Sequence, residues 1–198
     1  GLDMLLSTNP IAAAVPAGAE APVVLDMATT VAAYGKVKAK AQRGETMPEG
    51  WMIDRDGRPL TDPRRADEGF LLPIGGYKGY GLALLVGLLA GTLNGAAMGK
   101  DVVDFNHDQA SATNTGQAIV AIDIAAFGDV AAFKARVDDL VRDLRTSRRM
   151  PGVERIWLPG EQSQAKRIAY ARDGIPIAAG LMRNLNRLAA ELGIAAFA

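Results

Sequence analysis

The sequence has 198 residues, with 22 basic and 22 acidic side chains and an isoelectric point near 6.8. This balance argues against nucleic acid and anionic membrane as main partners, because both are bound through a basic protein face. The absence of cysteine excludes disulfides and thiolate chemistry, and the single histidine, His107, cannot build a histidine-rich zinc site, so no metal site is expected. The hydrophobic content of 49% excludes a disordered chain.

The first element expected is a strand at residues 22–27, where PVVLDM is a short run of apolar and β-branched side chains. A helix is expected over residues 31–42, with a threonine cap before it and Gly44 as its stop signal. Residues 44–76 then form a long polar stretch interrupted by prolines. Such a stretch is uncommon in a compact domain unless it is functional or wraps another element.

A glycine-rich stretch follows, LPIGGYKGYGLALL at residues 72–85, and it places Lys78 at the mouth of an apolar segment. Glycines let a ligand approach the backbone closely, and a helix N-terminus presents unpaired N–H groups. Lysine adds a mobile full charge, so the combination suits a phosphate or a carboxylate. The alternative is a turn into a buried helix with an incidental lysine.

The helix after this stretch is expected over residues 80–97, within an uncharged run that approaches the length of a membrane span. Glycines recur every fourth residue on one face of it: Gly87, Gly91, Gly95 and Gly99. In lipid such a face is a dimerisation motif, whereas in a soluble protein it lets a sheet or a second subunit pack closely. We favour a fully buried helix and no membrane, because glycines dilute the hydrophobicity. We also see no secretory signal and expect a cytoplasmic protein.

The second half of the chain alternates expected strands with expected helices. Strands are expected at residues 117–123 (QAIVAID) and 155–158 (RIWL), and helices over residues 133–144, from residue 161 and over residues 177–192. The wet side of the first of these helices is expected to carry Asp138, Asp139, Arg142 and Asp143. This alternation indicates an α/β fold. No G-x-G-x-x-G follows a strand, so the standard dinucleotide fingerprint is missing.

Five motifs occur in order along the chain: STNPIAAAVPAG (7–18), VLDMATT (24–30), AYGKV (33–37), LLPIGGYKGYGLALL (71–85) and LPGE (158–161). Together they resemble the second type of NAD(P)-dependent malate/L-lactate dehydrogenases, whose relatives include ureidoglycolate and L-sulfolactate dehydrogenases and the reductases of diketogulonate and piperideine-2-carboxylate. The resemblance spans essentially the whole chain. It implies a three-layer α/β/α arrangement around a mixed sheet, distinct from the Rossmann fold, and a homodimer.

The resemblance implies NAD or NADP as cofactor and a small 2-oxo or 2-hydroxy acid as substrate. The cofactor contacts that it implies are Asp26, Met27, Ala28, Tyr77, Lys78, Pro159, Gly160 and Glu161, and Thr8 is the implied substrate contact. Tyr77 departs from the family pattern, which usually has histidine there; tyrosine can stack or hydrogen-bond but carries no charge near pH 7. The alternatives are a capping or turn aspartate at Asp26 and an ST-turn at Thr8.

The resemblance also implies that residues 1–198 are the C-terminal two-thirds of a dehydrogenase, including most of its cofactor-binding region. Family members carry an N-terminal segment with the catalytic histidine and the arginine that grips the substrate carboxylate. His107 lies in a polar loop outside the motifs, so we interpret it as a surface histidine and expect no catalytic residue in this chain. The alternative is a truncated fragment that only binds a nucleotide or a small anion, or only assembles.

Overall fold

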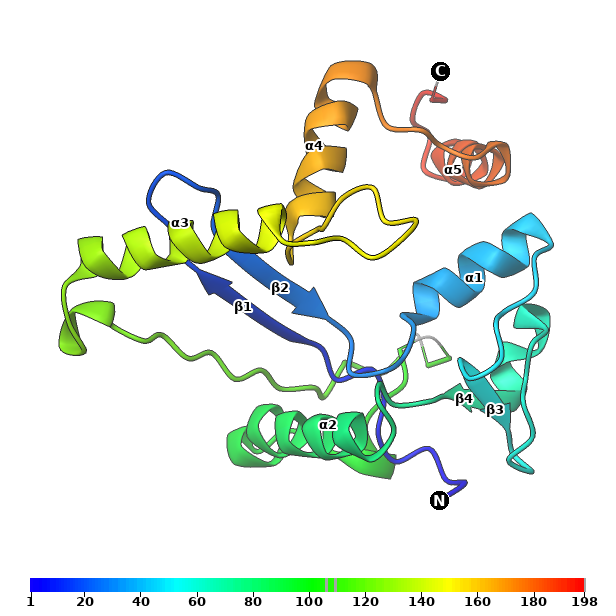
Figure 1. The fold of residues 1–198 in the computed structure, drawn as a ribbon. Helices are drawn as coiled ribbons and strands as arrows, with labels where there is room; N and C mark the ends of the chain where they lie inside the picture. The colour runs from blue at the N-terminus through cyan, green and yellow to red at the C-terminus, as the bar shows by residue number, and fades with distance from the viewer. Residues whose placement is uncertain (106, 109, 198) are drawn as a thin grey trace.

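The computed structural model describes residues 1–105, 107, 108 and 110–197. These residues form five α-helices and four short strands, and Figure 1 shows the helices spread around two small antiparallel ladders in an open arrangement. The predicted α/β class is confirmed. Because each ladder has only two strands, the three-layer arrangement around a mixed sheet stays a prediction.

The first ladder lies at the centre of Figure 1 and joins β1 (Ile11–Val15) to β2 (Val23–Met27). The strands are antiparallel, with Ile11 opposite Met27 and Val15 opposite Val23. The sequence predicts β2 but not β1, because the alanine-rich IAAAV has little of the β-branched character that marks a strand. A two-stranded ladder is only marginally stable alone, so this hairpin depends on what packs against it.

The second ladder belongs to a lobe on the right of Figure 1, where β3 (Met52–Asp54) pairs with β4 (Gly69–Leu71) beside α1 (Tyr34–Arg43). α1 ends at Gly44, whose φ of 68° lies in the left-handed region that glycine adopts freely. The predicted helix stop is therefore confirmed.

The main hydrophobic core of the chain lies in this lobe, and its members are Val37, Met47, Met52, Leu60 and Ala66. All of them except Val37 come from residues 44–76. The polar stretch that the sequence predicts either to be functional or to wrap another element therefore wraps α1 and β3, and it supplies most of the side chains that cover them.

α2 (Tyr77–Ala90) starts earlier and ends earlier than the predicted helix at residues 80–97. Its buried residues are Gly79 and Ala83, whereas Leu85 and other large side chains of the helix are exposed. The prediction of a fully buried helix is therefore wrong for this chain. In the part of the chain that the structure describes, no helix has the length and apolar character needed to cross a bilayer.

Two of the four glycines predicted to line one helix face have close neighbours, but these neighbours are neither a sheet nor a second subunit. A Cβ added to Gly87 would lie 3.0 Å from the Asn9 side-chain nitrogen, and one added to Gly91 would lie 2.7 Å from the Gly87 carbonyl oxygen. Gly95 and Gly99 lie beyond the helix with φ of 68° and 67°, so they serve turns instead.

The second half of the chain contains three helices, as predicted: α3 (Val130–Thr146), α4 (Glu161–Asp173) and α5 (Ala179–Glu191). The strands expected at residues 117–123 and 155–158 are not formed, so these two predictions are wrong for this chain. Their local patterns are apolar enough for strands, but a strand also requires a partner strand. Among the described residues, no strand pairs with either segment.

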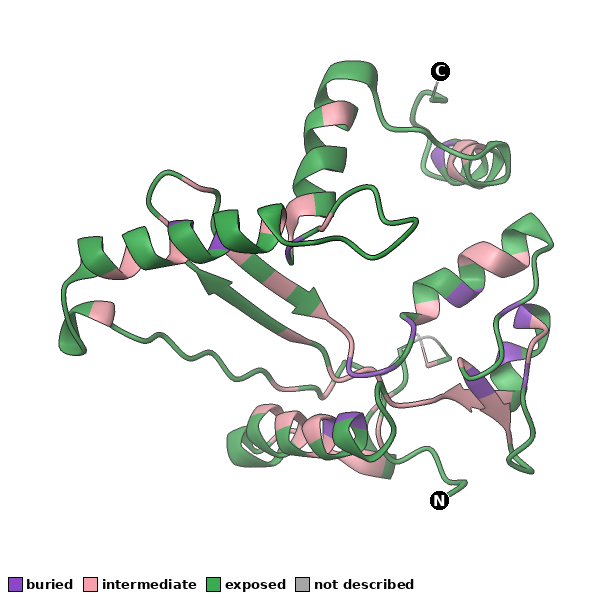
Figure 2. Cartoon of the chain, in the orientation of Figure 1, coloured by how far each residue is buried: buried purple, intermediate pink, exposed green. Residues whose placement is uncertain are grey.

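The chain exposes a larger surface than a compact protein of its mass. The accessible surface of 14567 Å² is about 1.6 times the ~9,000 Å² of a compact monomer of this mass. Figure 2 shows the buried residues in the lobe around α1, in the middle of α3, at the start of α2, at one position of α5 and at a few connecting positions. The chain therefore covers much less apolar surface than its length allows.

Candidate functional site

Three of the sequence motifs meet through a short series of hydrogen bonds. The Thr8 carbonyl oxygen accepts from the Thr29 N–H at 2.9 Å and from the Thr29 hydroxyl at 3.1 Å. The Thr29 carbonyl oxygen in turn accepts from the Ile74 N–H at 2.9 Å. Thr29 is fully buried, so water does not compete for these bonds. The structure thus brings the TNP, DMATT and IGGYKG motifs to one place.

Asn9 joins the same region to α2, and no sequence motif predicts this role for it. Its side-chain nitrogen donates to the Ala83 carbonyl oxygen at 2.8 Å, inside the first half of the helix. Its φ is 21°, on the left-handed side that asparagine tolerates better than most residues. The only available signal was an asparagine directly before a proline, which by itself indicates a turn.

The two alternatives considered from the sequence for Asp26 and Thr8 are wrong. Asp26 lies inside β2 opposite Ala12 and is exposed, so it is neither a helix cap nor a turn residue. The Thr8 hydroxyl makes no hydrogen bond to any described residue, so it forms no ST-turn there. Met27 and Ala28, which follow Asp26, are half-buried. The roles expected for these residues in binding stay predictions.

The glycine turn before α2 has the features that an anion requires. Gly75 and Gly76 have φ of 60° and 63°, and no atom lies within 4 Å of the position a Cβ would take on either residue. No side chain caps the helix at Gly76, so the electropositive end of α2 faces this open space. Lys78 is exposed and forms no ion pair with any described residue. Tyr77 is 80% exposed beside it.

The LPGE turn lies against the other end of β2. The Pro159 carbonyl oxygen accepts from the Val24 N–H at 3.3 Å. Gly160 has a φ of 88°, and a Cβ on it would lie 3.0 Å from the Val24 carbonyl oxygen, so only glycine fits. The six residues from Val24 to Thr29 span about 16 Å of extended chain. The predicted contact residues therefore follow β2 from one end to the other.

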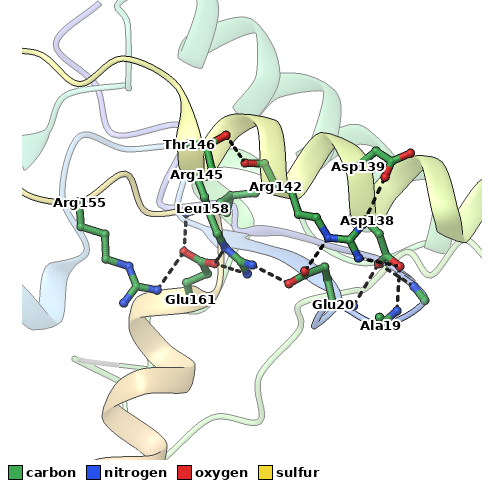
Figure 3. Close-up of polar contacts among 11 residues, drawn as sticks. Ala19, Glu20, Asp138, Asp139, Arg142, Arg145, Thr146, Arg155, Leu158 and Glu161 are labelled. Atoms are coloured by element: carbon green, nitrogen blue, oxygen red, sulfur yellow. Dashed lines mark hydrogen bonds and ion pairs between the residues drawn. The ribbon is translucent and has the colours of Figure 1, made fainter.

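Glu161 is held by a network of charges that Figure 3 shows between α3 and α4. Its carboxylate accepts from the Arg145 guanidinium at 2.7 Å and from the Leu158 N–H at 3.0 Å, and Arg145 also donates to Glu20 at 2.5 Å. Burial raises the pKa of Glu161, but the Leu158 N–H and Arg145 outweigh burial and leave that pKa below its ordinary value. The carboxylate thus has a structural role, and its expected cofactor contact stays a prediction.

Asp138 joins α3 to the loop between β1 and β2. Its carboxylate accepts from three consecutive N–H groups, at 2.9 Å from Gly18, 2.8 Å from Ala19 and 3.1 Å from Glu20. The Ala19 N–H, with the other two, holds the pKa of Asp138 below its usual range although burial opposes this. The residue is only 6% exposed, so its predicted place on the solvent-exposed side of α3 is wrong.

His107 lies on the surface, as the interpretation of the sequence requires. Its side chain is 65% exposed, and its Nδ1 lies 3.0 Å from the Asp104 carboxylate. Within the described ranges no three histidine, aspartate or glutamate side chains are grouped closely enough to hold a metal ion.

The chain is thus of the α/β class, and an exposed lysine at an open glycine turn is an arrangement that suits an anion. Comparison with known proteins gives the family. A family model described as malate/L-lactate dehydrogenase matches residues 1–186. The chain belongs to this family.

Relatives in the family are similar along nearly the whole chain. The malate dehydrogenase of Pyrococcus horikoshii is 35% identical over 98% of this chain and 55% of its own length. The ureidoglycolate dehydrogenase (NAD(+)) of Escherichia coli is 34% identical over 89% of this chain and 50% of its own. The crystal structure of a dehydrogenase from Sinorhizobium meliloti superposes with a TM-score of 0.82 at 36% identity, over 93% of this chain and 53% of that one. The chain spans about half the length of the relatives it matches.

Proposed function

We propose that this chain is the part of a nicotinamide-dependent oxidoreductase that binds the cofactor, and that the complete enzyme transfers a hydride between NAD or NADP and a small 2-hydroxy or 2-oxo acid. The observation that carries the proposal is the run of hydrogen bonds from Thr8 through Thr29 to Ile74, because it joins three family motifs beside an open, electropositive turn. Two of the relatives are named as dehydrogenases of malate and of ureidoglycolate, and both compounds are 2-hydroxy acids.

The residues present fit a dinucleotide. Gly75, Gly76 and Lys78 would hold a phosphate at the start of α2, since the space above the turn is open and the lysine charge is available. Residues 26–28 and 159–161 would contact the rest of the cofactor along β2. When bound, the nicotinamide ring donates or accepts the hydride, and Thr8 would contact the substrate beside it.

Hydride transfer also needs an acid that protonates the substrate oxygen and a group that grips the substrate carboxylate. We assign neither group to this chain. The carbonyl oxygen of a 2-oxo acid gains charge as hydride arrives, and a positioned acid that protonates it contributes roughly 10²- to 10⁴-fold. His107 is exposed and lies outside the family motifs, so we do not assign it as that acid. We propose that the remaining, N-terminal portion of the enzyme supplies the acid and the carboxylate clamp. The complete enzyme is proposed to be cytoplasmic, because a diffusing dinucleotide has to be available to it. It is also proposed to be a homodimer, as the family resemblance implies.

Lys78→Ala in the complete enzyme tests the cofactor site. The variant is expected to weaken NAD(P)H binding by about 1.5–3 kcal/mol, or roughly 10- to 150-fold, the range for a charged hydrogen bond. Fluorescence titration of the reduced cofactor measures this. Lys100→Ala, which removes an exposed lysine outside the motifs, is the control. An unchanged dissociation constant in a folded Lys78→Ala protein would remove Lys78 from the site.

The isolated 198-residue chain provides the second test. It is expected to show no enzymatic reduction of pyruvate, oxaloacetate or oxalurate, and co-expression with the N-terminal portion is expected to restore NAD(P)H oxidation. Turnover by the isolated chain that is lost on His107→Ala would contradict the proposed division of roles.

A further inference from the structure

Residues 117–123 have the composition of a strand but no partner in this structure. In the part of the chain that the structure describes, residues 118–122 make no hydrogen bond through backbone or side chain. Ile119, Val120 and Ile122 are 90%, 81% and 71% exposed. Figure 1 shows the segment as an extended trace leading towards α3. Five consecutive residues thus present unpaired backbone groups and large apolar side chains to solvent.

The pattern of side chains says what kind of strand this is. Successive residues of an extended chain point to opposite faces, so Ile119 and Ala121 share one face and Val120 and Ile122 share the other. Both faces are apolar. A strand with two apolar faces is typical of the interior of a sheet that is covered on both sides, whereas an exposed edge strand carries charges or proline. The segment therefore calls for neighbouring strands and for covering layers.

The segment is bonded to another element at its start, and a capped turn follows its end. The Gln117 carbonyl oxygen accepts from the Asn94 side chain at 3.0 Å, next to the end of α2. Asp123 accepts from the Ala125 N–H at 3.0 Å, in the turn that leads to α3. The unpaired stretch thus runs from an anchored point beside the helix that carries Lys78 to the turn that leads to α3.

Two observations identify what covers the segment. The accessible surface exceeds that of a compact monomer by about half or more. The same arrangement, over 93% of this chain, forms about half of one longer polypeptide in the Sinorhizobium meliloti structure, so the other half belongs to the same molecule. A second copy of this chain that pairs its own segment across a two-fold axis would cover a single edge only, and each segment has two edges.

We propose that residues 117–123 form an interior strand of a sheet that the remaining portion of the enzyme completes. That portion adds strands by backbone hydrogen bonding and covers both apolar faces. The inference rests on the proposed function only in assigning that portion to the same dehydrogenase. It places the assembly surface on the segment that links α2, with its anion-accepting turn, to α3.

Hydrogen exchange followed by mass spectrometry tests the pairing without any need for activity. The amides of residues 118–122 are expected to exchange at nearly the free rate in the isolated chain and about 100-fold or more slowly in the complete enzyme. The amides of β3 serve as an internal control, since they are paired in the lobe of α1 in both samples. Free exchange of residues 118–122 in the complete enzyme would overturn the proposal. Protection in the isolated chain that grows with its concentration would assign the strand to a second copy and overturn the proposed occupant.

Proline substitutions separate backbone pairing from side-chain packing. Val120→Pro and Ala121→Pro each remove one N–H, and because successive N–H groups point to opposite edges, the pair tests both. Val120→Ala and Ala121→Ser keep the N–H and are the matched controls. We expect at least one proline variant to reduce co-purification with a tagged N-terminal portion about 10-fold or more, with both controls within about threefold of the parent. Normal recovery of both proline variants, or equal loss in the controls, would exclude pairing through this backbone. A complete enzyme that is inactive but protected at residues 118–122 would contradict the proposed function alone.

Discussion

Two regions of the chain treat their apolar side chains in opposite ways. In the lobe of α1, β3 and β4, Val37 and Met52 are buried in a cluster that the chain builds from its own residues. In residues 117–123 and along α2, side chains of the same kind, such as Ile119 and Leu85, face solvent. The difference teaches that composition alone does not make a core. The lobe has a wrapping segment of its own, and we infer that the other region is built to be covered by further polypeptide.

Truncation inside the lobe is expected to have the largest effect on stability. Met52→Ala should lower the free energy of unfolding by about 2–5 kcal/mol, because it leaves a cavity in a filled core. Chemical denaturation of the isolated chain and of the complete enzyme should give similar losses. Met150→Ala is the matched control, since Met150 is 74% exposed. A loss below 1 kcal/mol at Met52 would mean that the lobe is not a self-sufficient core.

Ile119→Ala sharpens the comparison, because its effect should depend on which polypeptide is present. In the isolated chain the change in unfolding free energy is expected to stay within about 0.5 kcal/mol, as at other surface positions. In the complete enzyme Ile119 is expected to be buried, so the same truncation should lower the free energy of unfolding by about 2–5 kcal/mol. The two denaturation curves are measured side by side. Equal small effects in both samples would break the distinction between the regions.

Gly91→Leu tests a contact that both forms of the protein share. A Cβ at residue 91 would meet the carbonyl oxygens of Gly87 at 2.7 Å and Ala97 at 2.9 Å, so a loss of about 1–3 kcal/mol is expected from overpacking. Gly81→Leu is the control on the same helix, because nothing lies within 4 Å of a Cβ there. Thermal melting measures both variants. Equal melting temperatures for Gly91→Leu and the parent would show that this helix face is open.

The smallest effect expected is the pH dependence that Asp138 contributes. Its pKa is lower in the folded chain than in the unfolded chain, so its stabilising contribution is present above the unfolded value of about 3.9 and is lost as the pH falls through the folded value. Asp138→Asn should therefore melt at a lower temperature than the parent at pH 7, and the gap should close at acid pH. Asp139→Asn, on an exposed neighbour, is the control. A gap that persists unchanged at acid pH would exclude the carboxylate as its cause.

The elements that the sequence predicts well are those with a local cause. The stop at Gly44 needs only a residue that accepts positive φ, and α3 needs only apolar side chains at helical spacing. The order of the sequence motifs likewise identifies the family, whose model matches residues 1–186, without any knowledge of the fold. Local chemistry is sufficient for these features because the atoms that decide them are close in the chain.

The features that the sequence misses depend on distant residues. The local pattern around Asp138 predicts a solvent-exposed helix position. The residue is nevertheless buried, and its carboxylate accepts hydrogen bonds from N–H groups about 120 positions earlier in the chain. Asn9 contacts a carbonyl 74 positions away. Residues 117–123 have the pattern of a strand but lack a partner among the described residues. In each case the local signal is genuine, and the outcome is decided by a partner that the local signal does not name.

The hydrogen bonds that join Thr8, Thr29 and Ile74 run mainly between backbone groups, and this has a consequence for evolution. A backbone bond survives when the side chain beside it is replaced, so the frame of the site does not constrain which side chains it displays. Tyr77, which departs from the pattern expected from the family resemblance, lies on such an exposed position. Mutation can therefore vary what the site recognises while the fold beneath it stays the same, and one scaffold can diversify into many specificities.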